Sequence, residues 1–390
     1  MKKLLIVASL FALLISCKAP EIILTPYEVI PITEKPETIH STGMFYALPR
    51  QSVEVDITIR KQEFIKGPYA EFAERLLGVT NFIKENNTIY SIDDVFVSQK
   101  SEVDPKQIYF VQFNDSKLAL KYDNNLIIRG VNLSKTEPSG FRKKDSERQI
   151  VQASQAANRP IIPTFNTFER KDTVFFNQMV DTQLVQRFEI RTVQTVKTPL
   201  QKAQEIVESI AKIREDRNRL LTGFQEVNYE AAAIQYMNEE FNRMEDEYIS
   251  LFTGTTKSSF ETVRFEFLPE DKDNLTVKLA GFLPDHGLVN VELEEDVPDV
   301  KIITLNIALQ DDILSGIQQF SKNIRLPRRG FFYNIPSPAL VTVKFDNQLL
   351  FSKPMPFSQF GTTQSLAPDF LQIDFSPQTG EIRSVRAIGN

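Results

Sequence analysis

Few residues of this chain have the types and spacing that acid–base or metal chemistry requires. There are two histidines, His40 and His286, and they lie in unrelated parts of the sequence. An imidazole-based metal site normally gathers two or more such rings, so we expect none here. Asp285 and His286 form an adjacent carboxylate–imidazole pair that could transfer a proton. Because Pro284 and Gly287 flank the pair, we interpret it as a solvated loop.

Carboxylates occur in short groups, including Glu239–Glu240, Glu245–Glu247 and Glu294–Asp296. Two facing carboxylates are the basis of glycoside hydrolysis. The first two groups belong to a predicted helix with an apolar opposite face, so we interpret them as its solvated side. The third precedes Pro298 and is interpreted as a turn, with a calcium site as the alternative. With no Gly-x-Ser-x-Gly elbow and no glycine-rich phosphate loop, we assign no catalytic, cofactor-binding or metal-binding residue and do not expect an enzyme.

The N-terminus is typical of an exported, lipid-modified protein. Met1 to Lys3 begin with two lysines, and an apolar run from Leu4 to Ile15 follows. This run is too short to remain as a membrane-spanning helix and is typical of a signal peptide. Leu14 to Cys17 resembles the lipobox of bacterial lipoproteins, so we predict cleavage before Cys17 and lipid on that residue. Cys17 is the only cysteine, which excludes an intramolecular disulfide and a cysteine-based zinc site.

Charge and flanking residues limit the location and the partners. Lys18 follows the cysteine, unlike the aspartate retention signal of enteric inner-membrane lipoproteins, so we predict the outer membrane. Glu21 is a sparse acidic signal that favours the extracellular over the periplasmic face. The formal net charge is -6 and no basic stripe is present, so we expect no nucleic acid. The patch Arg325–Arg329 is interpreted as a solvated loop, with acidic lipid headgroups or an acidic partner as the alternative.

The elements that would position these residues begin after a signal peptide at 1–16. Residues 17–42 carry the lipid and four prolines, which predicts an extended tether. Residues 43–133 are predicted as a β-rich module with alternating apolar residues at 53–59, one short helix at 69–77, and strands at 108–113, 118–122 and 126–131. The turns between these last strands are expected at 114–115 and 123–124. Residues 134–197 are predicted as a polar linker with connecting strands near 173–176 and 187–196.

Two helices and a second β-rich module complete the expected architecture. Thr198 and Gly223 mark the start and the end of the first helix, and the second runs from about 228 to Gly254. The short connection between them predicts an antiparallel helical hairpin over 198–254. Residues 255–390 alternate in hydropathy and predict antiparallel strands with hairpins near 346–347 and 379–380. The fold class is therefore α+β, mainly antiparallel β, with two sandwich or barrel-like modules and a helical hairpin. Gly43–Pro49 also resembles Gly330–Pro336, which suggests an internal duplication.

Several segments together resemble one known family. They are Gly43-x-Phe45-Tyr46-x-Leu48-Pro49, Gly67-Pro68-Tyr69-Ala70, the helical stretches 203–223 and 245–256, Ile335-Pro336-x-Pro338-Ala339 and Gln359-Phe360-Gly361. This order is similar to that of the domain-of-unknown-function 4831 family of Bacteroidota envelope lipoproteins. The resemblance implies an exported envelope protein and brings no activity and no catalytic residues. Asp172-Thr173-Val174 resembles the Bacteroidota O-glycosylation motif, which makes Thr173 a candidate glycosylation site, with an ordinary turn into a strand as the alternative.

Three functions are compatible with these features. The first is a non-enzymatic, lipid-anchored subunit of an outer-membrane complex for protein assembly, export or uptake, attached to the membrane through Cys17. The second is a glycan- or peptidoglycan-binding lipoprotein, which the absence of tryptophan disfavours because sugars commonly stack on that ring. The third is a hydrolase with a site that has no recognisable motif. The tether, the β-rich modules and the helical hairpin favour the first hypothesis.

Overall fold

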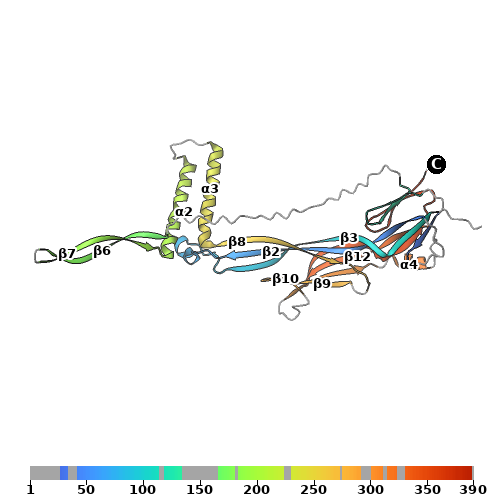
Figure 1. Ribbon diagram of the computed structural model, residues 1–390, viewed down its shortest axis with the longest axis horizontal. Helices are drawn as coiled ribbons and strands as arrows, with labels where there is room; N and C mark the ends of the chain where they lie inside the picture. Colours follow the sequence, from blue (N-terminus) through green and yellow to red (C-terminus); the bar gives the residue numbers. More distant parts are fainter. Residues whose placement is uncertain are drawn as a thin grey trace, which may run out of the picture.

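The molecule is elongated, with most of its strands parallel to the long axis (Figure 1). The computed structural model describes residues 27–33, 42–113, 118–133, 166–180, 183–223, 230–272, 275–290, 300–310, 314–322 and 330–388. A β-rich body lies at one end, two helices stand near the other, and a thin ribbon projects beyond them. The strands pair antiparallel throughout the described sheets, and the predicted α+β class is confirmed.

The first layer of the body is a four-stranded sheet in the order β1-β3-β2-β8. Its strands are β1 (Tyr27–Pro31), β2 (Gly43–Ile65), β3 (Asn87–Phe113) and β8 (Thr255–Phe267). The predicted alternation is confirmed, because Val53, Val55 and Ile57 are fully buried. The predicted strand at 108–113 is only the end of β3, which has 27 residues and pairs with β1 and β2. We had expected this strand to pair with the next one along the chain, but that next strand pairs with the one after it instead.

Part of the predicted tether belongs to this layer. Tyr27–Pro31 pairs along β3 as an edge strand, and Val29 is fully buried. Pro31 lies at the end of β1, where a missing N–H is tolerated. The segment is therefore a strand and not a solvated spacer, because alternate apolar side chains can be buried between two prolines. Residues 34–41 and those before 27 lie outside the described residues.

The second layer is a five-stranded sheet in the order β10-β9-β11-β12-β13. Its strands are β9 (Thr276–Leu283), β10 (Gly287–Val289), β11 (Lys301–Leu309), β12 (Phe331–Phe345) and β13 (Gln348–Leu366). The two sheets pack face to face through one apolar cluster, to which β2 contributes Val55 and Ile57 and the second sheet contributes Leu305 and Val343. None of the described sheets closes on itself, so the body is a sandwich rather than a barrel.

A small third sheet covers the end of the sandwich in the order β15-β14-β5-β4. It contains β4 (Leu120–Tyr122), β5 (Ile128–Val131), β14 (Leu371–Phe375) and β15 (Ile382–Ala387). Each half of the chain contributes one hairpin, and β5 pairs with β14 between them. The predicted turns at 123–124, 346–347 and 379–380 are confirmed, and the one at 114–115 lies outside the described residues. A second apolar cluster under this sheet includes Tyr46, Tyr109 and Phe331.

The sequence similarity between Gly43–Pro49 and Gly330–Pro336 extends to the strand pairing. Ala47 pairs with Ile108 and Pro49 with Val103. In the second sheet Ile335 pairs with Thr362, and the strands shift register one residue further along the equivalent segment. There too, a step of two residues on the first strand faces a step of five on its partner, from Thr362 to Phe357. The two long hairpins, β2–β3 and β12–β13, therefore carry the same irregularity.

Equivalent backbone hydrogen bonds support the same conclusion. Ala47 and Asn334 occupy the same place in the two similar segments. The amide of Ala47 donates to the carbonyl of Leu126 at 2.9 Å, and that of Asn334 donates to the carbonyl of Gly380 at 3.0 Å. Both acceptors lie in the turn of a short hairpin of the third sheet, at φ 65° and φ 72°. We interpret the body as a duplicated unit of one long hairpin followed by one short hairpin.

The helical hairpin is confirmed with nearly the predicted bounds. α2 (Pro199–Thr222) begins with a capping box made by Thr198 and Gln201 and ends at Gly223, whose φ of 73° suits glycine. α3 (Ala231–Thr253) ends at Gly254. The short predicted helix at 69–77 forms a 3₁₀ turn, η1 (Ala70–Phe72), followed by a π turn, η2 (Ala73–Leu77). A further helix, α4 (Leu314–Lys322), lies beside the second sheet.

The helices join the body through a tight apolar junction. Tyr69 and Ala73 pack with Ile206 of α2 and with Leu251 and Phe252 of α3. A Cβ at Gly67 would lie 2.4 Å from the carbonyl oxygen of Leu251, so the two backbones could not approach this closely with any other residue at 67. From this junction β2, β3 and β8 run to the body as a three-stranded stalk (Figure 1).

Candidate interaction surface

The residues that the sequence singled out for chemistry do not converge. Asp285 and His286 form an exposed ion pair, with the carboxylate 2.9 Å from Nδ1 and about 70 % of each side chain exposed. The hydrogen bond from His286 holds the pKa of Asp285 below its ordinary value. This geometry is that of the solvated loop that we expected. Cys17, His40, Glu294–Asp296 and Arg325–Arg329 lie outside the described residues.

One carboxylate group was interpreted wrongly. Glu245 is buried, although the sequence placed it on the solvated side of its helix. It accepts hydrogen bonds from Arg214 at 2.6 Å and from Arg217 at 2.8 Å, both of which reach across from α2. The two arginines shield the carboxylate from water and compensate its charge, so it ties the helices together. Within the described part of the chain no cluster of three or more histidine, cysteine, aspartate or glutamate side chains could hold a metal ion.

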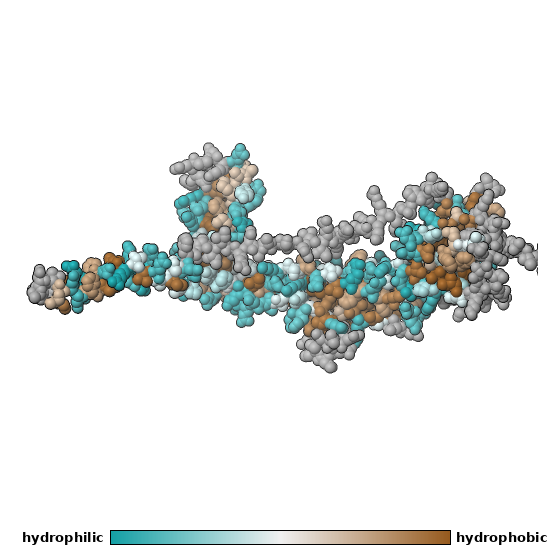
Figure 2. Space-filling view, in the orientation of Figure 1, coloured by the Kyte–Doolittle hydropathy of each residue, from teal (hydrophilic) through white to brown (hydrophobic). Residues whose placement is uncertain are grey.

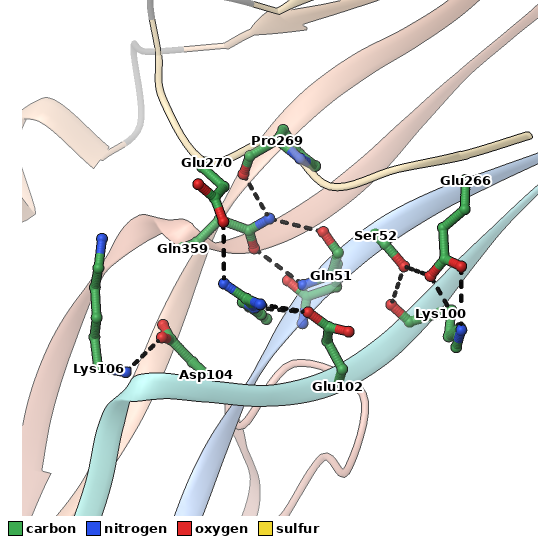
Figure 3. A network of polar contacts seen from close by, with 11 residues as sticks. Gln51, Ser52, Lys100, Glu102, Asp104, Lys106, Glu266, Pro269, Glu270 and Gln359 are labelled. Atoms are coloured by element: carbon green, nitrogen blue, oxygen red, sulfur yellow. Dashed lines mark hydrogen bonds and ion pairs between the residues drawn. The ribbon is translucent and has the colours of Figure 1, made fainter.

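A second polar network joins the two layers of the sandwich (Figure 3). The side chain of Gln51 is buried, donates to the carbonyl of Gln378 at 2.5 Å and accepts from the amide of Ser358 at 2.6 Å. Its backbone exchanges hydrogen bonds with the side-chain amide of Gln359 at 3.1 and 2.7 Å. Both the nitrogen and the oxygen of the Gln51 side-chain amide are therefore hydrogen-bonded to residues far away in the sequence. This network is a structural clasp rather than a reaction centre.

The most unusual surface of the molecule is the projecting ribbon. It consists of β6 (Thr167–Val180) and β7 (Gln183–Val196), paired over their whole length. Figure 2 shows apolar side chains along the ribbon, well away from the cores of the body and the helices. Because side chains alternate between faces and paired residues share a face, the register defines two different faces.

We call one side the apolar face. Its cross-strand pairs are Thr173–Ile190, Phe175–Phe188, Asn177–Gln186 and Met179–Leu184. Their apolar members are 58–67 % exposed, which is far from the buried state that such residues normally adopt. The rings of Phe175 and Phe188 lie 6.4 Å apart and form the centre of the patch. No charged residue occurs among these eight positions.

The opposite side, which we call the charged face, also carries apolar side chains, but they are less exposed, at 39–44 % for Val174, Phe176, Val185 and Val193, and they lie among charged residues. Arg170 binds Asp172 at 2.7 Å, and Arg191 binds Glu189 at 3.0 Å. These pairs lie between residues two apart on one strand and are themselves largely exposed, so they add little stability. The contrast between the faces resembles one layer of a β-sandwich that lacks its second layer.

The base of the ribbon is held by the first turns of α2. Lys197 forms an ion pair with Glu205 at 2.6 Å, and its side chain is only 11 % exposed. The ammonium of Lys202 donates to the side chain of Asn166 at 2.8 Å, and the amide of Lys197 donates to the carbonyl of Asn166 at 2.9 Å. The ribbon is therefore oriented by the helical hairpin, which itself rests on the junction at Gly67.

Thr173, the candidate glycosylation site, lies on the apolar face of β6 and is exposed. The sequence predicted strands here, at 173–176 and 187–196, but not that they form one independent ribbon. The missed signal is the matched alternation of Phe175, Asn177 and Met179 on one strand with Leu184, Gln186 and Phe188 on the next. Only four residues, 180–183, separate these runs in the sequence, and so short a separation is the pattern of a hairpin. The composition of the preceding segment led us to extend the linker into it.

A groove of about 500 Å³ lies where the two sheets of the body diverge. Its walls include the rings of Tyr90, Phe282 and Phe345 together with Asp93 and Lys301. The Lys301 ammonium lies 5.6 Å from the centre of the Phe345 ring, so part of its charge is already engaged. Aromatic rings beside polar groups are typical of sites that bind sugars.

The fold and these surfaces define an elongated α+β protein, built on an antiparallel sandwich with a helical hairpin and an exposed ribbon. The chain belongs to the family described as domain of unknown function DUF4831, whose model matches residues 42–383. Comparisons with curated proteins and with solved structures gave no match. Among the helices of the described residues, none is long and apolar enough to cross a membrane.

Proposed function

We propose that this protein is a non-enzymatic, lipid-anchored subunit of an envelope complex in Bacteroidota. The observation that carries the proposal is the apolar face of the ribbon. A contiguous exposed apolar patch on a soluble protein is often functional and commonly marks an interaction site. The ribbon's projection beyond the helices leaves this face accessible to a partner (Figure 1).

The location rests on the N-terminal sequence. The basic start, the short apolar run and Cys17 favour export followed by acylation of that cysteine. Lys18 favours the outer membrane, on the periplasmic or, as we prefer, the extracellular face. The process that the complex serves is protein assembly, export or nutrient uptake. These are the processes that outer-membrane complexes with lipoprotein subunits carry out.

The experiment that tests the proposed function is affinity purification of the tagged chain from its own membranes in mild detergent. The matched control is a ribbonless variant in which 167–196 are replaced by Asn-Gly, since Asn166 and Lys197 are already hydrogen-bonded neighbours. We expect an outer-membrane protein in stoichiometric amount with the full chain and its loss with the ribbonless variant. Recovery of the chain with no other protein would contradict the proposal.

Anchoring is tested separately with Cys17→Ala. Metabolic labelling with radioactive palmitate should mark the natural chain and not the variant, and the variant should leave the membrane fraction. Equal labelling of both proteins would contradict lipid attachment at Cys17.

A second candidate function is glycan binding in the groove at Tyr90. The three aromatic rings that line it favour this alternative over an unrecognised hydrolase. Polysaccharide and peptidoglycan pull-downs with the natural chain and with Tyr90→Ala would test it. Retention that depends on Tyr90 would support a binding lipoprotein, and no retention of either chain would exclude it.

A further inference from the structure

We propose that the apolar face of the ribbon packs against the same face of a second copy of this chain, so that the protein is a two-fold symmetric dimer. The inference rests on the proposed function in taking the ribbon as an interaction surface. The two apolar faces would cover each other, and an envelope partner would bind the paired ribbons, which the ribbonless variant lacks. The contact would complete the missing layer of the half-sandwich, with two ribbons stacked face to face.

The area of the face is of the size that a dimer needs. Phe175, Met179, Leu184, Phe188 and Ile190 are 58–67 % exposed. Since large apolar side chains have on the order of 150–200 Å² of surface each, these five expose on the order of 500 Å². A standard interface buries about 800 Å² on each partner. Thr173, Asn177 and Gln186 on the same face would supply part of the difference, which predicts a reversible dimer rather than an obligate one.

Charge complementarity favours a second copy. Among the eight residues of the apolar face none is charged, so two copies can meet without repulsion or the burial of an unpaired ion. The nearest charges on this side, Lys171 and Glu169, lie toward the base of the ribbon. The charged face has its ion pairs satisfied within each strand and can stay in water.

The order of the pairs along the face is self-complementary. A two-fold axis between the ribbons, crossing the strands at Asn177 and Gln186, would place each amide opposite its own copy. A carboxamide is both donor and acceptor, so identical amides can hydrogen-bond to each other. The same axis places Phe175 opposite the partner's Met179 and Phe188 opposite the partner's Leu184. Methionine sulfur and aromatic rings attract each other, and each bulky pair meets one of matching size.

A bilayer is a less suitable occupant. Among the residues that the structure describes, the ribbon has two strands, so the outer edge of each strand presents backbone N–H and C=O groups that no described strand pairs with. Immersion in hydrocarbon would remove water from these groups at a cost of several kcal/mol each. Packing of one face against another ribbon leaves both edges in contact with water. The geometry therefore points to a protein layer and not to lipid.

The test uses two cysteine variants of the full-length protein that differ only in the face that carries the thiol. Asn177→Cys lies at the proposed axis, and Gln178→Cys is an exposed neighbour on the charged face. Because stacked sheets lie about 10 Å apart, a direct disulfide is too short and a short bis-maleimide linker is used. We expect a cross-linked dimer with N177C and none with Q178C or with the natural chain, which controls for Cys17. Equal yields from both variants, or none from N177C, would overturn the proposal.

A third variant checks that apolar packing drives the contact. Met179→Glu in the N177C chain places a carboxylate opposite the partner's Phe175, and it should weaken association about tenfold. Measured at a concentration at which both chains are monomeric, its thermal midpoint should not change, because Met179 is 65 % exposed in the single chain. An undiminished cross-link would contradict the proposed register.

A photoreactive amino acid at Phe188, in cells, separates this inference from the proposed function. An adduct with the mass of two chains is the expected result. An adduct with a different protein would overturn the second copy as occupant while supporting the envelope complex. An adduct with lipid alone would contradict both, because the ribbon would then not be a protein-binding surface.

Discussion

At the scale of single residues, the clearest case is Gln51, a polar side chain that is 1 % exposed. Burial of an amide is unfavourable unless its donors and acceptors are satisfied. Gln51 meets this requirement with groups from Ser358 and Gln378, which belong to the second half of the chain. This role could not be predicted from the sequence, because the strand that contains Gln51 is recognised only by its apolar alternation.

Gln51→Leu should therefore destabilise the body strongly. The substitution leaves the buried Ser358 amide without its acceptor, which costs about 1–3 kcal/mol in the free energy of unfolding. Urea denaturation followed by circular dichroism measures this loss. Gln348→Leu, at an exposed position, is the matched control and should change the free energy by less than about 0.5 kcal/mol. Equal effects of the two substitutions would contradict the role of the clasp.

Two buried tyrosines make stability dependent on alkaline pH. Burial raises the pKa of Tyr46 and of Tyr109 above the ordinary value of 10.0. The folded state therefore keeps both protons at a pH at which the unfolded state loses them. Their contribution is intact below pH 10 and falls as the pH rises above it, by at most about 1.4 kcal/mol per pH unit for each tyrosine.

The measurement is the urea midpoint between pH 8 and pH 11. Tyr46→Phe should flatten the alkaline decline, although it removes the acceptor for the Phe332 amide at 2.8 Å and lowers stability at neutral pH. Tyr236→Phe is the control, since Tyr236 is 68 % exposed and should leave the slope unchanged. A Tyr46→Phe protein with the natural slope would refute this explanation.

At the scale of elements, the junction at Gly67 decides whether the helices hold their position. Gly67→Ala would bring a Cβ to 2.4 Å from the Leu251 carbonyl oxygen, so the backbones must separate. We expect a loss of about 1–3 kcal/mol, confined to the helices and the ribbon that they support. Hydrogen exchange should show faster exchange in 199–253 and unchanged protection in β12 and β13.

Gly316→Ala in α4 is the matched control for this prediction. Nothing lies within 4 Å of a Cβ at Gly316, and alanine favours a helix over glycine. The substitution should leave exchange in 199–253 unchanged and be neutral or slightly stabilising. Faster exchange throughout the body after Gly67→Ala would contradict the prediction that the loss of stability is confined to the helices and the ribbon.

The elements differ in how well the sequence could predict them. α2 and α3 were predicted within a few residues, because Thr198, Gly223 and Gly254 act locally through capping and chain reversal. β3 was not, since Asp93 and Asp94 interrupt the apolar alternation in its first half, which is held as a strand by pairing with β2. Glu245 was misplaced for a related reason. A single-helix pattern cannot show that Arg214 and Arg217 of another helix cover it.

At the scale of the whole molecule, the ribbon should be separable from the fold. Its side chains contribute little buried surface, so the ribbonless variant with Asn-Gly between 166 and 197 should keep a thermal midpoint within about 2 °C of the natural chain. Small-angle scattering should show a shorter particle. A large fall in the midpoint would mean that the ribbon stabilises the body, and its apolar face would then need another explanation.

The arrangement of the whole molecule was only partly predictable. The similarity of Gly43–Pro49 to Gly330–Pro336 correctly suggested two related units, and alternation predicted two β-rich halves. That β2 pairs with β8 and β5 with β14 depends on contacts about 190 to 240 residues apart, which no local pattern encodes. The exposed ribbon could have been predicted as a hairpin, but not as one that stands free of the body.

The long strand β2 has a mechanical consequence. It runs for 23 residues from the body to the helical junction, and β3 and β8 accompany it. At about 3.3 Å per residue it spans on the order of 75 Å. Inter-strand hydrogen bonds lie perpendicular to the strands, so tension along the long axis loads many of them together in shear. A force applied to the ribbon would therefore be transmitted to the body by the three-stranded stalk, and the helical junction would separate before the stalk does.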